Sequence, residues 1–187
     1  MSQITKRALA ASLKRLLAEK PLSKITISDI TDDCGINRMT FYYHFQDIYD
    51  LIEWICLDEG GRAIEGKKDY KSWQDGLVSL CHVMLENRAF IEGVYHSVQR
   101  EQLENHLYRV VYSLLFDVIE EVAKDRSISA EDMRYIANFY KYAFVGIMLD
   151  WVRDGMQEDP KRIVERISLL IEGDIVRALE KMRIDRE

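Results

Sequence analysis

The sequence has few of the residues that tie small proteins together or interrupt helices. Its three cysteines, Cys34, Cys56 and Cys81, lie far apart among 187 residues and form no Cys-x-x-Cys pair. This spacing argues against a disulfide framework and against a cysteine-based zinc site. Only two prolines, Pro21 and Pro160, are present. Long helices are therefore permitted over most of the chain.

Long apolar runs are also missing. No segment approaches the roughly 20 uncharged apolar residues of a membrane span. Residues 1–7 lead into an amphipathic pattern and not into the uninterrupted apolar run of a signal peptide. We therefore expect a cytoplasmic protein with no membrane partner.

Positive charge is scarce overall, since the formal net charge is −6. It is concentrated at the N-terminus, where residues 1–24 carry six basic side chains and one acidic side chain, Glu19. The basic residues are Lys6, Arg7, Lys14, Arg15, Lys20 and Lys24. A basic N-terminus on an acidic body is typical of a protein that offers one face to phosphates, although an ordinary solvated helix face has the same pattern.

Apolar residues recur with the helical period along most of the chain, whereas strand signals are nearly absent. The sequence predicts an all-α protein of about nine helices. We place them at residues 2–19, 28–34, from a cap at Asn37 to about 44 or 45, and at 48–62, 72–87, 89–94, 99–125, 130–155 and 160–182. Ser28, Asp47, Ser129 and Asp159 are the other predicted caps.

The most informative segment is residues 26–45. Ile27, Ile30 and Cys34 share one face of its first short helix, and Phe41 and Phe45 share one face of its second. Gly35 permits the left-handed backbone that reverses the chain between them. This pattern predicts a helix-turn-helix whose second helix points outward.

The outward face of that second helix mixes arginine, methionine and aromatic side chains. Arg38 is suited to a guanine edge, and Met39 and Thr40 are suited to thymine methyl groups. Phosphate contacts suit a second set of polar side chains, and the whole predicted DNA-binding set is Thr26, Ser28, Arg38, Met39, Thr40, Tyr42, Tyr43 and His44. The backbone amides at the N-termini of the helices beginning near Ser28 and Ile48 are further candidates for phosphate contacts. The alternative is a helical corner with an aromatic exterior and no DNA.

This segment resembles the TetR family of bacterial regulators. The resemblance rests on Thr-x-x-Asp-Ile, Gly-Ile and Thr-Phe-Tyr-x-His-Phe in order from residue 26, and it extends over about residues 5–57. Residues 41–46, 51–55 and 69–74 further resemble the branch related to regulators of dihydroxyacetone-kinase operons. The family implies a homodimer on a palindromic double-stranded operator. It also implies control by a small-molecule effector, with repression or activation as the outcome.

The resemblance implies two domains: a DNA-binding domain of three helices over residues 1–47 and a larger ligand-binding and dimerisation domain over residues 48–187. The chain departs from the family at two positions. Ile48 stands where members usually carry a phosphate-contacting lysine, and Ser28 where they often carry an arginine. An interaction module or co-regulator that binds DNA weakly, or only with a partner, is therefore the alternative function.

The last two predicted helices are rich in large apolar residues. From the sequence alone an intramolecular core explains them as well as a dimer interface does, but the family pairs these helices with their copies. The predicted interface is Tyr135, Tyr142, Trp151, Ile163, Ile167, Leu170, Ile171 and Ile175. The predicted effector pocket is lined by Trp73, Tyr95, His96, Tyr112, Phe116, Phe139, Tyr140 and Phe144.

Two histidine–carboxylate pairs, His82 with Glu86 and Glu92 with His96, have helical i,i+4 spacing. No third metal ligand is fixed by spacing, so we predict neither a metal site nor a cofactor. No nucleophile–base arrangement or phosphate-binding glycine loop is recognisable, and the sequence does not favour an enzyme.

Overall fold

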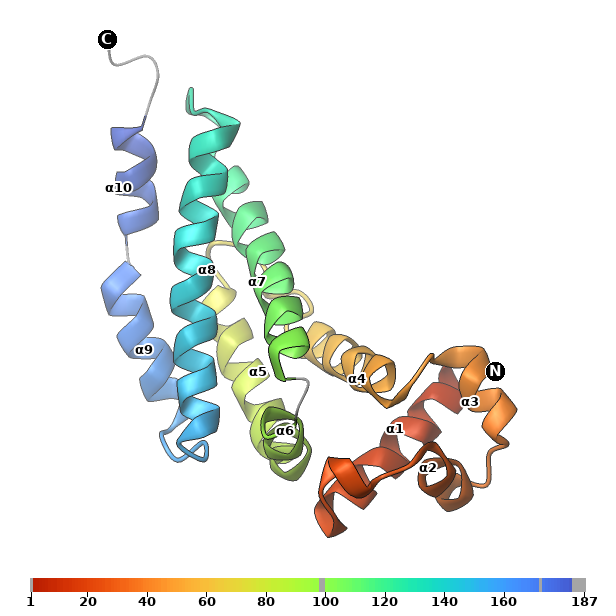
Figure 1. The fold of residues 1–187 in the computed structure, drawn as a ribbon. Coiled ribbons are helices and arrows are strands. Elements are labelled where there is room, and N and C mark those ends of the chain that lie inside the picture. The colour runs from red at the N-terminus through yellow and green to blue at the C-terminus, as the bar shows by residue number, and fades with distance from the viewer. Residues whose placement is uncertain (1, 98–99, 172, 183–187) are drawn as a thin grey trace. The chain divides into compact units, whose positions relative to one another are not determined.

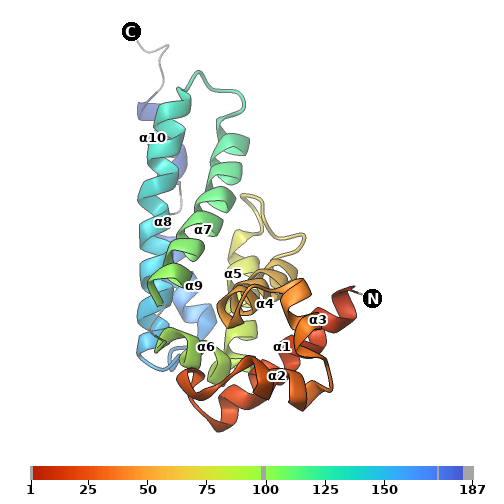
Figure 2. The same ribbon diagram turned by 45° about the vertical axis from the view of Figure 1, so that its right-hand side comes forward.

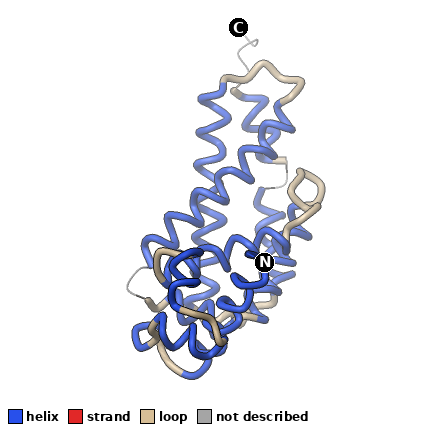
Figure 3. The backbone as a smooth tube through the Cα atoms, turned by 90° about the vertical axis from the view of Figure 1, so that its right-hand side faces the viewer, coloured by secondary structure: helices blue, strands red, loops and turns tan. Residues whose placement is uncertain are grey.

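A computed structural model describes residues 2–97, 100–171 and 173–182. These residues form ten α-helices and one short 3₁₀ helix, and no strand is found among them (Figure 3). None of the helices in the described part of the chain is long and apolar enough to span a membrane. The helices are α1 (Ser2–Glu19), α2 (Ile27–Cys34), α3 (Arg38–His44), α4 (Ile48–Ala63), α5 (Trp73–Glu86), α6 (Arg88–Tyr95), α7 (Arg100–Ala123), α8 (Ala130–Arg153), α9 (Pro160–Ile171) and α10 (Asp174–Lys181), and the 3₁₀ helix is η1 (Leu22–Lys24). The all-α prediction is confirmed.

Most of the predicted N-caps accept hydrogen bonds from the first turn of their helices. Asn37 accepts a hydrogen bond from the Met39 amide at 2.8 Å, and Asp47 accepts from Tyr49 and Asp50 at 2.8 and 2.9 Å. Ser129 accepts from the Asp132 amide at 3.0 Å. These side chains satisfy backbone amides that have no partner inside their own helices.

Two local predictions are wrong. The cap of α2 is Thr26 and not Ser28: its hydroxyl accepts from the Asp29 amide at 3.2 Å, while Asp29 accepts from the Thr26 amide at 2.8 Å. This reciprocal pair is a capping box. The helix predicted over 160–182 is broken, because Gly173 has a φ of +74° and α10 begins after it.

The chain divides into two compact units, residues 1–62 with 83–103 and residues 63–82 with 104–187. The first unit contains α1–α4 and α6, with α1 in contact with α2, α3 and α6 (Figure 1). Its core joins the predicted helix-turn-helix residues Ile30, Phe41 and Phe45 to Leu51 of α4 and Phe90 of α6. This compact unit is larger than the 1–47 domain expected from the sequence. That residues 1–47 form the DNA-binding domain stays a prediction.

In the second unit, α7 and α8 run side by side, and α10 packs on α8 and α9 (Figures 1 and 2). Ile119, Ala137 and Leu179 are fully buried in its core. Cys81 is also fully buried, and this burial raises the pKa of its thiol to about 12. All three cysteines are free.

Candidate DNA-binding surface and effector cavity

The helix-turn-helix has the predicted geometry. Gly35 follows α2 with a φ of +67°, and its backbone amide donates to the carbonyls of Asp32 and Thr31. Phe41 and Phe45 face the core with 0% and 3% of their surface exposed, and their ring centroids are 5.8 Å apart. The buried phenylalanine pair therefore fixes which face of α3 remains outside.

The outside of α3 is rich in large side chains. Met39, Tyr42 and Tyr43 are 75%, 51% and 83% exposed, and Arg38 is exposed at the N-terminal end of the helix. Thr40 and His44 are half-buried, and the His44 ring lies 4.9 Å from that of Tyr43. Large apolar and aromatic side chains grouped on one exposed surface are typical of an interaction site.

Two of the predicted phosphate contacts are engaged within the chain. The Thr26 hydroxyl donates to Asp29 Oδ2 at 2.9 Å, so its only hydrogen is already used. At the start of α4, Asp47 accepts hydrogen bonds from two backbone amides that would otherwise be free to bind a phosphate. Ser28 lies half-buried in the first turn of α2 and is not a cap. We therefore keep Ser28, but not Thr26, as a candidate phosphate contact.

The basic residues of the N-terminus are largely paired within the chain. Lys20 Nζ lies 3.1 Å from Asp29 Oδ2, and Arg15 pairs with Asp33 at 2.5 Å. Lys6 Nζ lies over the Phe45 and Trp54 rings, 5.3 and 5.6 Å from their centroids. Within the described residues, no ion pair or ring contact is found for Arg7 and Lys24, which are exposed.

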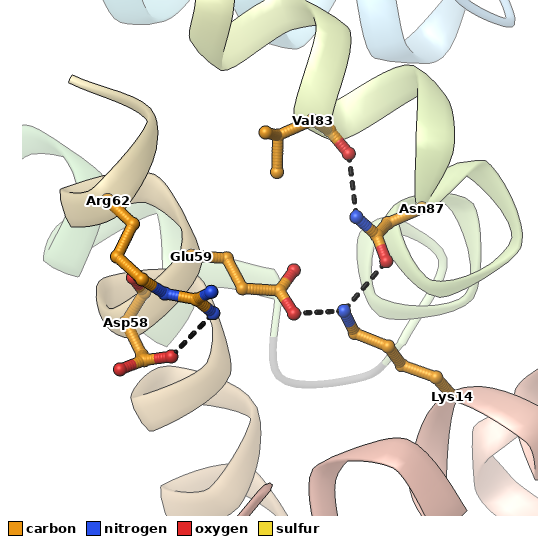
Figure 4. A network of polar contacts seen from close by, with 6 residues as sticks. All are labelled: Lys14, Asp58, Glu59, Arg62, Val83 and Asn87. Atoms are coloured by element: carbon orange, nitrogen blue, oxygen red, sulfur yellow. Dashed lines mark hydrogen bonds and ion pairs between the residues drawn. The ribbon is translucent and has the colours of Figure 1, made fainter.

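Lys14 has a different role, shown in Figure 4. Its ammonium group pairs with Glu59 of α4 and donates to Asn87 Oδ1 at 2.7 Å, while Asn87 Nδ2 donates to the Val83 carbonyl at 2.7 Å. It also lies 5.6 Å from the Phe90 ring centroid. Lys14 therefore ties α1 to α4 and to the cap of α6, and its ammonium group is engaged within the chain.

The second unit contains an apolar cavity of about 130 Å³. Two helices supply most of its wall with the same spacing: Trp73, Gly76, Leu77 and Leu80 from α5, and Val111, Leu114, Leu115 and Val118 from α7. The remaining lining residues are Ile64, Lys67, Lys68, Tyr70, Phe144, Ile171 and Ile175. Trp73 and Phe144 meet edge to face at 5.6 Å between centroids.

Only Trp73 and Phe144 of the predicted pocket residues line this cavity. Tyr112, Phe116 and Tyr140 pack on the core around Ile119, and Phe139 is 66% exposed. Tyr95 and His96 belong to the first unit. The sequence prediction favoured aromatic residues, whereas the cavity wall is mainly aliphatic.

The predicted dimer residues also divide into two groups. Tyr135, Tyr142 and Leu170 are 69%, 59% and 72% exposed. Phe139 and Leu169, which the predicted interface did not include, are also exposed, at 66% and 77%. Four other predicted interface residues are buried within the chain and have little surface to offer a partner: Trp151, Ile163, Ile167 and Ile175. Ile171 lines the cavity. We revise the predicted interface accordingly and define the exposed apolar face as Tyr135, Phe139, Tyr142, Leu169 and Leu170.

Among the described residues, no group of three or more histidine, cysteine, aspartate or glutamate side chains is placed to hold a metal ion. The two histidine–carboxylate pairs noted in the sequence are therefore not joined there by a third such ligand.

Comparison with known proteins matches both parts of the chain. Residues 4–55 match the model of bacterial regulatory proteins of the tetR family, and residues 71–173 match a transcriptional regulator C-terminal region of that family. The chain is 28% identical over 149 residues to the HTH-type dhaKLM operon transcriptional activator DhaS of Lactococcus lactis subsp. lactis (strain IL1403), covering 78% of each chain. This agrees with the branch that residues 41–74 resemble.

Solved structures show the same fold. A dihydroxyacetone kinase operon activator, DhaS, has a TM-score of 0.73 at 23% identity, with 96% of this chain and 98% of that chain covered. NalD, the secondary repressor of the MexAB-OprM multidrug efflux pump in Pseudomonas aeruginosa, has a TM-score of 0.62 at 18% identity, with 99% and 100% covered. The chain therefore belongs to the tetR family of bacterial regulatory proteins and is a transcriptional regulator.

Proposed function

We propose that two copies of this chain bind a palindromic operator in the cytoplasm, with the exposed face of α3 in the major groove. The observation that carries the proposal is the exposure of Arg38, Met39 and Tyr43 on a helix whose opposite face is buried through Phe41. A two-fold dimer places two such helices about 34 Å apart, one turn of DNA. The operator is then read by Arg38, Met39 and Thr40, flanked by Ser28, Tyr42, Tyr43 and His44.

The exposed apolar face on α8 and α9 supports the dimer. Its five members are large and lie on the outside of the second unit, where a single copy would leave them in water. Apolar contact between copies would bury this area and stabilise the pair. The cavity of the same unit supports control by a small-molecule effector.

Selection of binding sequences from random double-stranded oligonucleotides by the full-length protein tests the operator. We expect an enriched palindrome with two half-sites about one helical turn apart. Absence of any enriched motif would contradict direct operator binding. Transcription from a reporter carrying the selected site then shows whether the protein activates or represses. The likeness to the DhaS activator makes activation the first outcome to test.

A co-regulator that binds DNA only with a partner is the second candidate. It is supported by Ile48 and Ser28 at positions where the family usually has cations, and by the pairing of Lys14, Arg15 and Lys20 within the chain. Adding a cell extract to the selection separates the two. A motif recovered only with extract favours the co-regulator, and a motif recovered by the purified protein favours the direct reader.

A further inference from the structure

The lining of the cavity offers little to a polar ligand. Of its fifteen lining residues, only Lys67, Lys68, Tyr70 and Trp73 carry a polar side-chain group, and no carboxylate, amide or aliphatic hydroxyl is among them. Lys67 Nζ donates one of its three hydrogens to Ser79 Oγ at 2.7 Å, and Lys68 is exposed. A ligand with several hydroxyl groups would lose its hydrogen bonds to water and find few replacements.

The size of the cavity limits the ligand as well. Its volume is about 130 Å³. An enclosed apolar protein cavity of about 150 Å³ binds benzene, and this cavity is of similar size but partly open to solvent. Trp73 and Phe144 add two aromatic walls that meet edge to face, an arrangement that a third ring extends easily. A single small ring therefore fits both the space and the chemistry.

One wall is held in place by a close backbone approach. An added Cβ at Gly76 of α5 would lie 2.7 Å from the Lys67 carbonyl oxygen, so no side chain fits between α5 and the segment that follows α4. The Lys67–Ser79 hydrogen bond joins the same two segments. The wall between them is thus fixed at two points.

We propose that the cavity binds a small, mainly apolar molecule of about one ring, and not a polyol such as dihydroxyacetone. The inference rests on the proposed effector-controlled regulator and specifies the chemistry of its ligand. The effector of this chain would then be chemically unrelated to dihydroxyacetone, which appears in the name of its relative.

Binding of toluene and of dihydroxyacetone to the full-length protein tests the proposal. Toluene should raise the melting temperature in proportion to the logarithm of its concentration once the cavity is saturated, because it binds only the folded state. Dihydroxyacetone at the same concentrations should leave it unchanged. The opposite ranking would overturn the proposal.

Two cavity variants and a matched control place the ligand. Val111→Phe fills the cavity and should weaken toluene binding at least tenfold, whereas Val110→Phe, one residue away and not a lining residue, should leave it unchanged. Phe144→Ala enlarges the cavity and should allow naphthalene to bind, whereas we expect no naphthalene binding to the unaltered protein. Equal toluene binding by both valine variants, with no gain for Phe144→Ala, would show that toluene binds elsewhere.

Operator binding measured in the same samples separates this proposal from the proposed function. Toluene that binds in the cavity without changing operator affinity leaves the ligand class standing and contradicts the effector role. An unchanged operator motif with no toluene binding contradicts the ligand class and leaves the DNA-binding function standing.

Discussion

Arg38 is the first residue of α3, and its side chain is exposed beside Met39. A guanidinium group in this position can donate two hydrogen bonds to one guanine. We expect Arg38→Ala to cost about 1–3 kcal/mol on the selected operator and to relax base choice at one position in each half-site. Tyr42→Phe is the matched comparison: it removes a proposed phosphate contact and should weaken binding equally on all DNA sequences. Equal loss on all sequences for Arg38→Ala would refute its base-reading role.

The carboxylate of Asp29 stabilises the start of α2 through the capping box with Thr26. Hydrogen bonds from the Thr26 backbone, with help from Lys20, lower the pKa of Asp29 from 3.8 to about 2. Because the folded-state pKa is the lower one, this stabilisation is present above about pH 4 and is lost as the pH falls towards 2. Urea unfolding of the protein and of Asp29→Asn should therefore differ at pH 5 and converge near pH 2. A constant difference over this range would contradict the assignment.

At the scale of elements, Lys14 joins three helices. Lys14→Met would leave the partly buried Glu59 carboxylate and the Asn87 amide oxygen without this donor, at a cost of about 1–3 kcal/mol. Lys14→Met combined with Glu59→Met should recover part of the loss, since both members of the charged pair are then replaced. Denaturant unfolding of the two single variants and the double variant measures the coupling. Strict additivity would mean that the pair contributes nothing to stability.

The elements that the sequence predicts well are those with local signals. The helix-turn-helix follows from the Asn37 cap, the Gly35 reversal and the Phe41–Phe45 spacing, all set by residues close together in the chain. The true cap of α2 also had a signal, because Thr26 and Asp29 have the Thr-x-x-Asp spacing of a capping box whereas Ser28 has threonine at that distance.

The break between α9 and α10 could not be predicted in the same way. The apolar residues Ile167, Ile171, Ile175 and Leu179 continue at helical spacing through it, and an isolated glycine is tolerated within a helix. The cavity has the same difficulty, because its two main walls share the i, i+3, i+4, i+7 spacing of an ordinary packed core. Only tertiary packing decides whether such a face closes completely or leaves a space.

For the whole molecule, the exposed apolar face predicts dimerisation. We expect Leu170→Glu to give a monomer in size-exclusion chromatography with light scattering and to weaken operator binding, because a charge on this face would have to be buried. Leu57→Glu, at an exposed leucine of α4 in the other compact unit, is the control and should remain dimeric. A Leu170→Glu dimer would show that the copies meet elsewhere.

The pairing of the N-terminal cations within the chain also bears on how ionic strength affects DNA binding. Each phosphate neutralised by a cation releases condensed counterions and adds about −0.9 to the slope of log affinity against log salt concentration. With Lys6, Lys14, Arg15 and Lys20 engaged internally, Arg7 and Lys24 of two subunits would give a slope of only about −4. Titration of operator affinity with potassium chloride measures this slope, and a value near −10 would mean that the internal pairs open on DNA. A shallow slope would let the regulator keep its operator through large changes in the salt content of the cell.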